Sequence, residues 1–285
     1  MYNANDGVIF LKIEYKNNNI YIYGLEEFDL PHTLDCGQAF RWRQDQNNIW
    51  SGVAFNKFLK LEKLENGTVV FYDTSVEEYE NIWKDYFDLG RDYSEIIKKL
   101  SQNEILKNAC EYSHGIRILN QEPFETLCSF IISQNNNIRR IKGIIERLCE
   151  NFGDKKDGFY TFPTAEKLAS LTLEDLGVLR SGFRAKYLLD AAQKVANNEV
   201  KLYSLKDMPI DDARNELIKI KGVGPKVADC CLLFSHRHTE AFPKDVWIKR
   251  AMEILFKGEL PECAKEYAGI AQQYIFFYAR DTKIS

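Results

Sequence analysis

The stretch that most restricts the fold of this chain is residues 217–230, which read LIKIKGVGPKVADC. An amphipathic helical pattern runs into Gly222-Val223-Gly224, and Pro225 then opens a second helical pattern. Glycine tolerates positive φ and leaves a turn bare of side chains, while proline suits the first turn of a helix. The sequence therefore predicts a helix-hairpin-helix at about 212–234, whose main-chain N–H groups can approach a phosphate closely.

Two polar residues near this hairpin are candidates for chemistry. Lys226 stands in the first turn of the predicted second helix, where the helix dipole and partial burial would favour its neutral, nucleophilic amine. A phosphate contact or a solvated surface lysine would also explain Lys226. Asp245 follows Pro243 at the predicted start of the next helix, where an N-cap alone would account for it.

The hydrophobic pattern changes period along the chain. Alternating patterns predict strands at 21–23, 39–43, 49–55, 58–61 and 68–72, joined by short turns as an antiparallel meander. From Ser75, a possible cap, the spacing of apolar residues becomes helical, and helices are predicted through 87, over 138–152 and 188–195, and over 246–256. We therefore expect an α+β fold: an N-terminal antiparallel sheet lobe with flanking helices over 1–118, and a helical region over 119–285.

Composition limits the class of protein. The seven cysteines are odd in number and show no zinc-ligand spacing, so we expect reduced thiols and no metal. A net charge of -4 argues against a protein that coats nucleic acid non-specifically, although lysine and arginine gather locally. No arginine-led apolar segment opens the chain and no apolar run suits a membrane span, so we expect no membrane contact and a bacterial-type cytoplasmic, nucleoid-associated or nuclear location.

Several motifs together resemble one family. GVGPKVADC followed by PKDVW resembles the helix-hairpin-helix glycosylases that carry a Gly/Pro-rich loop and an aspartate. The runs CGQAFRW at 36–42, SQNNNI at 133–138 and GFRAKY at 182–187 occur in the order typical of the 8-oxoguanine DNA glycosylases. The resemblance covers roughly residues 25 to 280, and it implies a base-excision-repair glycosylase that also nicks the strand.

The resemblance also implies a role for each matching residue. Lys226 would attack C1′ of the damaged nucleotide and form a Schiff base, and Asp245 would stabilise the cationic sugar. The carbonyl of Gly37 would accept the hydrogen that 8-oxoguanine carries on N7, where guanine has only an acceptor. The remaining substrate-binding residues would be Cys230 and Phe276, which sandwich the base, and Gln272, which bonds its pairing edge.

DNA-binding residues follow from the same resemblance. A base flipped into a pocket leaves a gap in the duplex. Asn135 would fill this gap, Phe183 would wedge into the opposite strand, and Arg140 and Arg184 would read the estranged cytosine. The hairpin residues Gly222, Val223 and Gly224 and the adjacent Trp247 would contact the backbone. Purely structural roles would also explain some of these residues: helix capping for the asparagines, core packing for Cys230 and Phe276, and a strand-entry turn for Gly37.

The sequence departs from the family at two positions. Phe183 stands where vertebrate members carry tyrosine, and Trp247 stands where they carry histidine. We therefore expect a weaker preference for cytosine opposite the lesion. The iron–sulfur ligands of the endonuclease-III-like branch are missing, since only Cys263 follows Cys231, and no cofactor is implied.

Three other functions remain open at this point. A glycosylase of the same superfamily that acts on another damaged purine would not need Lys226. A non-catalytic module could use the hairpin as a clamp on the DNA backbone. A Schiff-base aldolase would normally show alternating strands and helices, which this chain lacks. For the glycosylase we expect damaged double-stranded DNA as the partner, and a monomer without an obligate protein partner.

Overall fold

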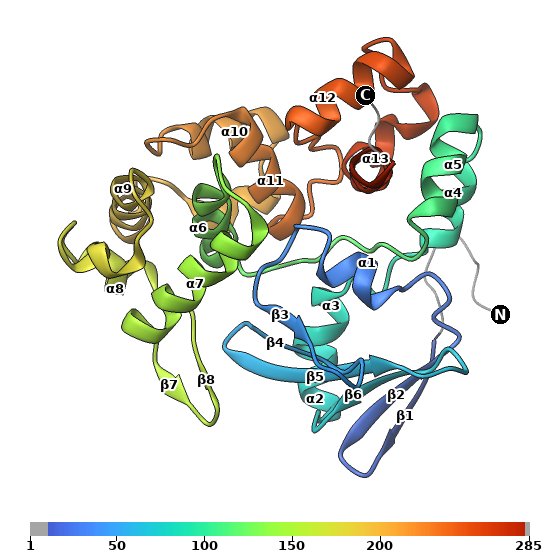
Figure 1. Cartoon of the computed structure of the whole chain (residues 1–285), viewed down its shortest axis with the longest axis horizontal. Helices are drawn as coiled ribbons and strands as arrows, with labels where there is room; N and C mark the ends of the chain where they lie inside the picture. The colour runs from blue at the N-terminus through green and yellow to red at the C-terminus, as the bar shows by residue number, and fades with distance from the viewer. Residues whose placement is uncertain (1–10, 283–285) are drawn as a thin grey trace.

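The computed structural model describes residues 11–282 and has an antiparallel sheet followed by a largely helical remainder (Figure 1). The six strands are β1 (Lys12–Lys16), β2 (Asn19–Tyr23), β3 (Trp42–Gln44), β4 (Trp50–Ala54), β5 (Lys57–Lys63) and β6 (Val69–Tyr72). Their order is β1-β2-β6-β5-β4-β3, and each neighbouring pair is antiparallel. The predicted α+β class is confirmed.

One face of the sheet is buried. Ile20 and Leu61 both pair with Phe71, so these three side chains lie in one row on the same face. The strand predicted over 39–43 was misplaced, since pairing begins only at Trp42. The strand β1 was not predicted, although its residues KIEYK alternate between charged and apolar. All five residues are exposed, so this alternation does not mark a buried face.

The helix predicted after Ser75 is interrupted by a π-helical turn. It consists of α2 (Val76–Glu78), a π segment (Tyr79–Trp83) and α3 (Lys84–Tyr86). The Ser75 Oγ accepts a hydrogen bond of 3.1 Å from the Glu78 N–H, so the predicted cap is confirmed. Trp83 and Phe87 are both fully buried in the cluster that includes the inner face of the sheet.

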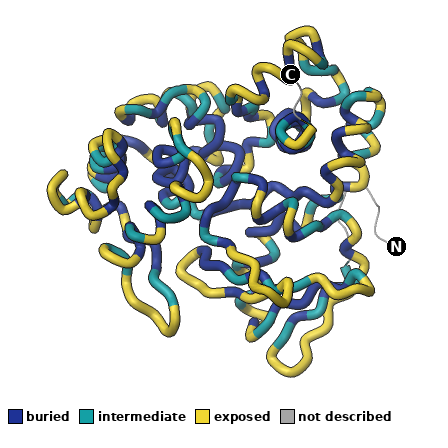
Figure 2. The backbone as a smooth tube through the Cα atoms, viewed as in Figure 1, coloured by how far each residue is buried: buried dark blue, intermediate teal, exposed yellow. Residues whose placement is uncertain are grey.

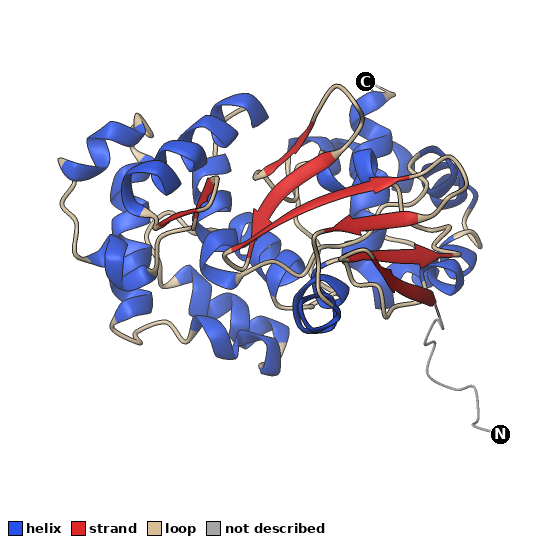
Figure 3. Cartoon of the chain, turned by 90° about the horizontal axis from the view of Figure 1, so that it is seen from below, coloured by secondary structure: helices blue, strands red, loops and turns tan. Residues whose placement is uncertain are grey.

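Most helices in the rest of the chain enclose a second and larger core, whereas the first helix contributes Leu30 and Leu34 to the core that includes the sheet. Their bounds are α1 (Leu30–Leu34), α4 (Tyr93–Leu100), α5 (Glu104–Tyr112), α6 (Pro123–Ser133), α7 (Ile138–Phe152), α8 (Ala165–Ala169), α9 (Arg184–Ala196), α10 (Ile210–Ile218), α11 (Pro225–Ser235), α12 (Val246–Phe256) and α13 (Ala268–Asp281). The helices predicted over 138–152 and 246–256 are confirmed with these bounds, and the one predicted over 188–195 lies inside α9. A short hairpin, β7 (Lys155–Lys156) and β8 (Phe159–Tyr160), was not predicted. Figure 3 shows the large sheet in one half of the molecule and mainly helices in the other.

The α6 and α11 helices lie at the centre of the helical region, where Figure 2 shows the backbone deeply buried. Most residues of both helices are buried, so the side chains that they carry are held rigidly. The α4 and α5 helices belong to the predicted first lobe by sequence, yet their apolar residues join the core of the helical region. The division near residue 118 stays a prediction.

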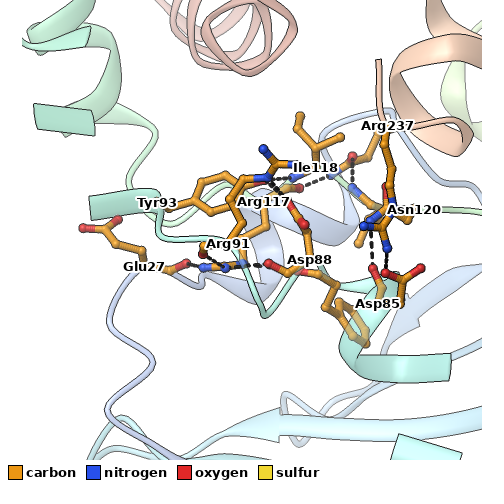
Figure 4. A network of polar contacts seen from close by, with 12 residues as sticks. Glu27, Asp85, Asp88, Arg91, Tyr93, Arg117, Ile118, Asn120 and Arg237 are labelled. Atoms are coloured by element: carbon orange, nitrogen blue, oxygen red, sulfur yellow. Dashed lines mark hydrogen bonds and ion pairs between the residues drawn. The ribbon is translucent and has the colours of Figure 1, made fainter. Parts of the chain in front are cut away.

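A buried arginine stands near the end of the N-terminal lobe (Figure 4). The Arg117 guanidinium is fully buried, and its carbon lies 4.2 Å from the centre of the Tyr93 ring. It donates hydrogen bonds of 2.7–3.2 Å to main-chain carbonyl oxygens of four residues: Glu27, Phe87, Asp88 and Arg91. Because Arg117 lies just before the segment that leads into α6, these bonds hold that segment against the N-terminal lobe.

Candidate active site

The helix-hairpin-helix is present as predicted. The α10 helix leads through Gly222-Val223-Gly224 into α11, which begins at Pro225. Gly222 has a φ of 80°, whereas Gly224 has an ordinary φ of -103°. Positive φ is therefore needed at the first glycine only. Val223 is buried, so it could meet DNA only through its main chain.

The start of α11 suits an anion. Gly224 is the N-cap residue of this helix and offers no side-chain acceptor to the first N–H groups. No protein atom lies within 4 Å of the position that a Cβ on Gly224 would occupy. Uncapped N–H groups in open space at a helix N-terminus are a favourable place for a phosphate.

A pocket beside this hairpin brings together all six residues predicted for catalysis and substrate binding. Its lining consists of Cys36, Gly37, Phe130, Lys226, Cys230, Phe234, Pro243, Asp245, Gln272, Gln273 and Phe276. These residues come from α6, α11, α13, the loop before α12 and the turn after α1. Segments far apart in the chain thus converge on Lys226.

Lys226 is half-buried on α11, and its Nζ lies 5.2 Å from the centre of the Phe130 ring. Burial raises the pKa of the Cys230 thiol one turn further along the helix, and the nearby Lys226 amine opposes that rise. The thiol is therefore favoured in its neutral form, in which it can pack against a flat ring.

Asp245 is both a cap and a pocket residue. Its Oδ1 accepts a hydrogen bond of 2.7 Å from the Ile248 N–H at the start of α12, so the capping alternative is confirmed. Burial raises the pKa of this carboxyl group, while the Ile248 N–H and the charge of Lys226 lower it. The cap fixes the carboxylate at the pocket wall, so the two roles are compatible.

The other pocket residues lie on three elements. Gly37 has a φ of 94°, which strongly favours glycine at this position. Cys230 on α11 and Phe276 on α13 line the pocket from different helices. Gln272 is almost fully buried on α13, one turn before Phe276.

Four of the predicted DNA-binding residues, Asn135, Arg140, Phe183 and Arg184, lie at or just before the starts of α7 and α9. Asn135 is exposed and has a φ of 50°, and Arg140 is exposed at the start of α7. Phe183 is 47% exposed, as a residue that wedges into a base stack must be. Trp247 is 38% exposed at the start of α12.

Arg184 is placed differently from what its predicted role suggests. Its side chain is buried and donates to the carbonyl oxygens of Gln134, Asn135 and Ser181. The guanidinium thus fixes the loop that carries Asn135, and reading of an estranged cytosine stays a prediction. The capping alternative holds for the last asparagine of the run, because Asn137 Oδ1 accepts from the Arg140 N–H at 3.0 Å.

Sequence reasoning missed Gln273, the second glutamine of the pocket. Its side chain is 4% exposed, and its Nε2 donates to Gln272 Oε1 at 3.2 Å. Only its position beside Gln272 on an otherwise apolar helix could have indicated it.

Residues 11–282 contain neither a metal-binding cluster nor a helix able to span a membrane. Within this part of the chain, no group of three or more His, Cys, Asp and Glu side chains is arranged to hold a metal ion. No helix in the same range has the length and apolar character that crossing a membrane requires.

Comparison with known proteins gives consistent matches. The family model described as "8-oxoguanine DNA glycosylase, N-terminal domain" matches residues 20–127, and "HhH-GPD superfamily base excision DNA repair protein" matches residues 128–266. An "N-glycosylase/DNA lyase" of Saccharomyces cerevisiae is 33% identical over 252 residues, which are 79% of this chain and 67% of that protein. A "Probable N-glycosylase/DNA lyase" of Methanothermobacter thermautotrophicus is 34% identical over 89% of this chain and 94% of that protein.

A solved structure agrees with these matches. The 8-oxoguanine glycosylase/lyase of Clostridium acetobutylicum, in complex with double-stranded DNA containing cytosine opposite 8-oxoguanine, superposes with a TM-score of 0.90 at 39% identity. The superposition covers 98% of this chain and 100% of that one. The chain therefore belongs to the 8-oxoguanine DNA glycosylase family of the HhH-GPD superfamily.

Proposed function

We propose that this protein excises 8-oxoguanine from double-stranded DNA and then nicks the strand through a Schiff base on Lys226. The observation that carries the proposal is the convergence of a half-buried lysine and a half-buried carboxylate on one pocket, beside a hairpin whose second helix begins with uncapped N–H groups. The names of the matching proteins support the same activity.

The reaction would proceed as follows. The Lys226 amine attacks C1′, the C1′–N9 bond breaks, and the base leaves with the bonding electrons and takes up a proton. The C1′–O4′ bond then breaks, O4′ takes up the proton that the attached amine gives up, and the nitrogen lone pair forms the C=N bond of an iminium ion at C1′. Loss of a proton from C2′ then expels the 3′ phosphate by β-elimination. Asp245 would stabilise the positive charge that develops on the sugar.

The rest of the site would bind and hold the DNA. The uncapped N–H groups at the start of α11 would bind a backbone phosphate near the lesion. Asn135 would fill the gap that the extruded nucleotide leaves, and Phe183 would wedge into the opposite strand. We further propose that the protein acts as a monomer without an obligate protein partner.

Borohydride trapping tests the proposal. A duplex with one 8-oxoguanine opposite cytosine is incubated with the wild type, Lys226→Gln and Asp245→Asn, beside an undamaged duplex. We expect a covalent band with the wild type on the lesion only, none with Lys226→Gln, and a much weaker one with Asp245→Asn.

The same experiment separates the alternatives. If the wild type binds the duplex but neither traps nor releases the base, the protein is a non-catalytic clamp. If it releases another damaged purine and leaves 8-oxoguanine intact, the substrate assignment is wrong.

A further inference from the structure

One lysine outside the pocket binds both ends of a segment that forms part of the pocket wall. Lys142 is half-buried in the second turn of α7. Its Nζ donates to Asp35 Oδ1 at 2.8 Å and to the Trp42 carbonyl oxygen at 3.2 Å. Asp35 directly follows α1, and Trp42 is the first residue of β3. A single ammonium group on α7 therefore joins the start and the end of the segment 35–42.

Two residues of this segment line the pocket, namely Cys36 and Gly37. They lie between Asp35, which Lys142 holds, and Gln38. The side-chain amide of Gln38 makes three hydrogen bonds of 2.8–3.0 Å to main-chain groups of α1 and of the segment before α6. This stretch of the pocket wall is thus fixed at both ends, and the Lys142 ammonium group provides one of the two attachments.

The wall between these attachments has little rigidity of its own. Residues 35–38 belong to neither a helix nor a strand. Gly37 has a φ of 94°, and within residues 11–282 no atom beyond its neighbours in sequence lies within 4 Å of the position that a Cβ would occupy. Glycine also has more main-chain freedom than any other residue. Loss of one attachment would therefore let Cys36 and Gly37 move relative to the other pocket residues.

We propose that Lys142 is a positioning residue that acts through Asp35 to hold the Cys36–Gly37 wall where the pocket receives a base. This inference rests on the proposed function, since it concerns the base that is excised. A nucleotide that has already lost its base has nothing to place against this wall. Lys142 therefore contributes to excision of the base and not to nicking at an abasic site, although Lys226 carries out both reactions.

A second ion pair between the same elements provides a matched control. Arg43 Nη2 lies 2.7 Å from Glu146 Oε1, so this pair also joins β3 to α7, one turn after Lys142. Arg43 lies outside the segment 35–42, and neither Arg43 nor Glu146 lines the pocket. Loss of this pair removes an attachment between the two elements without releasing the pocket wall.

The test measures two reactions under single-turnover conditions with enzyme in excess. One substrate is a duplex with 8-oxoguanine opposite cytosine, and the other is the same duplex with a preformed abasic site in place of the lesion. The variants are Lys142→Met, Asp35→Asn, Lys142→Arg and the control Arg43→Met. Lys142→Met and Asp35→Asn should each slow excision by about tenfold, the effect of one charge-assisted hydrogen bond, and should nick the abasic duplex at the wild-type rate.

The other variants and the double variant sharpen the test. Lys142→Arg keeps a charged donor and should restore most of the excision rate, and Arg43→Met should leave both reactions unchanged. Because the two residues act as a pair, the double variant of Lys142→Met and Asp35→Asn should be no slower than either single variant.

Three results would overturn the inference. The first is unchanged excision by Asp35→Asn, whose side chain is exposed, so that this variant decides even if Lys142→Met is poorly folded. The second is an equal loss on both substrates. The third is a loss with Lys142→Met alone, accompanied by weaker binding to an undamaged duplex, which would make Lys142 a phosphate contact. Failure of the wild type to release 8-oxoguanine would instead refute the proposed function.

Discussion

Replacement of Gly222 by alanine should lower the stability of the fold, whereas replacement of Gly224 should mainly weaken DNA binding at the hairpin. Gly222 has a φ of 80°, a region that costs an L-residue roughly 1–2 kcal/mol. An added Cβ would also lie 2.4 Å from Cδ2 of the Tyr187 ring, which must then move. Overpacking of this kind costs about 1–3 kcal/mol. Together the two effects predict a loss of about 3 kcal/mol in the free energy of unfolding.

Urea denaturation of Gly222→Ala and Gly224→Ala measures this loss against a matched control. Gly224 has an ordinary φ and open space around its Cβ position, so its replacement should lower the free energy of unfolding by less than about 0.5 kcal/mol. Gly224→Ala should nevertheless weaken binding to an undamaged duplex, because the added methyl group stands where a phosphate would approach. Equal stability of the two variants would refute the reasoning, as would unchanged DNA binding by Gly224→Ala.

Three further predictions concern other parts of the molecule. Arg117→Met should lower the free energy of unfolding by about 4 kcal/mol, since four main-chain carbonyl oxygens lose a buried donor, and a loss below about 1 kcal/mol in urea denaturation would contradict this. Burial raises the pKa of the Glu125 carboxyl group from 4.5 to about 7, so its contribution to stability is complete below pH 4.5 and is lost as the pH rises through 7. Relative to Glu125→Gln, the wild type should therefore lose stability over that window, and a constant difference between pH 4 and 8 would show that the shift is absent. Phe183→Tyr should increase the preference for cytosine over adenine opposite the lesion by about threefold or more in excision assays, and an unchanged ratio would count against a role of the missing hydroxyl group.

The parts of the fold that could be predicted are those in which a local pattern has a physical cause. The helix 138–152 ends at Gly153, and its apolar residues recur at the helical period, so its bounds follow from sequence. The strand β1 alternates charged and apolar residues but buries neither face, so its place in the sheet depends on pairing with β2. The π-helical turn at Tyr79–Trp83 likewise depends on packing against the sheet, which no local rule contains.

The site residues likewise differ in whether the sequence could identify them. Lys226 and Asp245 each stand at a helix start marked by proline or by a capping residue, but their catalytic roles followed only from the family resemblance. Gln273 could not be selected, since its place in the pocket wall depends on how α13 packs in the tertiary structure. The burial of Arg184 could not be predicted from the sequence either, because a charged residue in a GFRAKY run is expected at the surface.

The burial of Arg184 has a consequence for the thermodynamics of DNA recognition. Its guanidinium holds the main chain of Gln134 and Asn135 in place within the DNA-free protein. The conformational entropy of ordering this loop is therefore lost when the protein folds, and less remains to be lost when the duplex binds. An Asn135 side chain carried on a preorganised backbone can enter a gap in the base stack at a lower entropic penalty than one carried on a mobile loop.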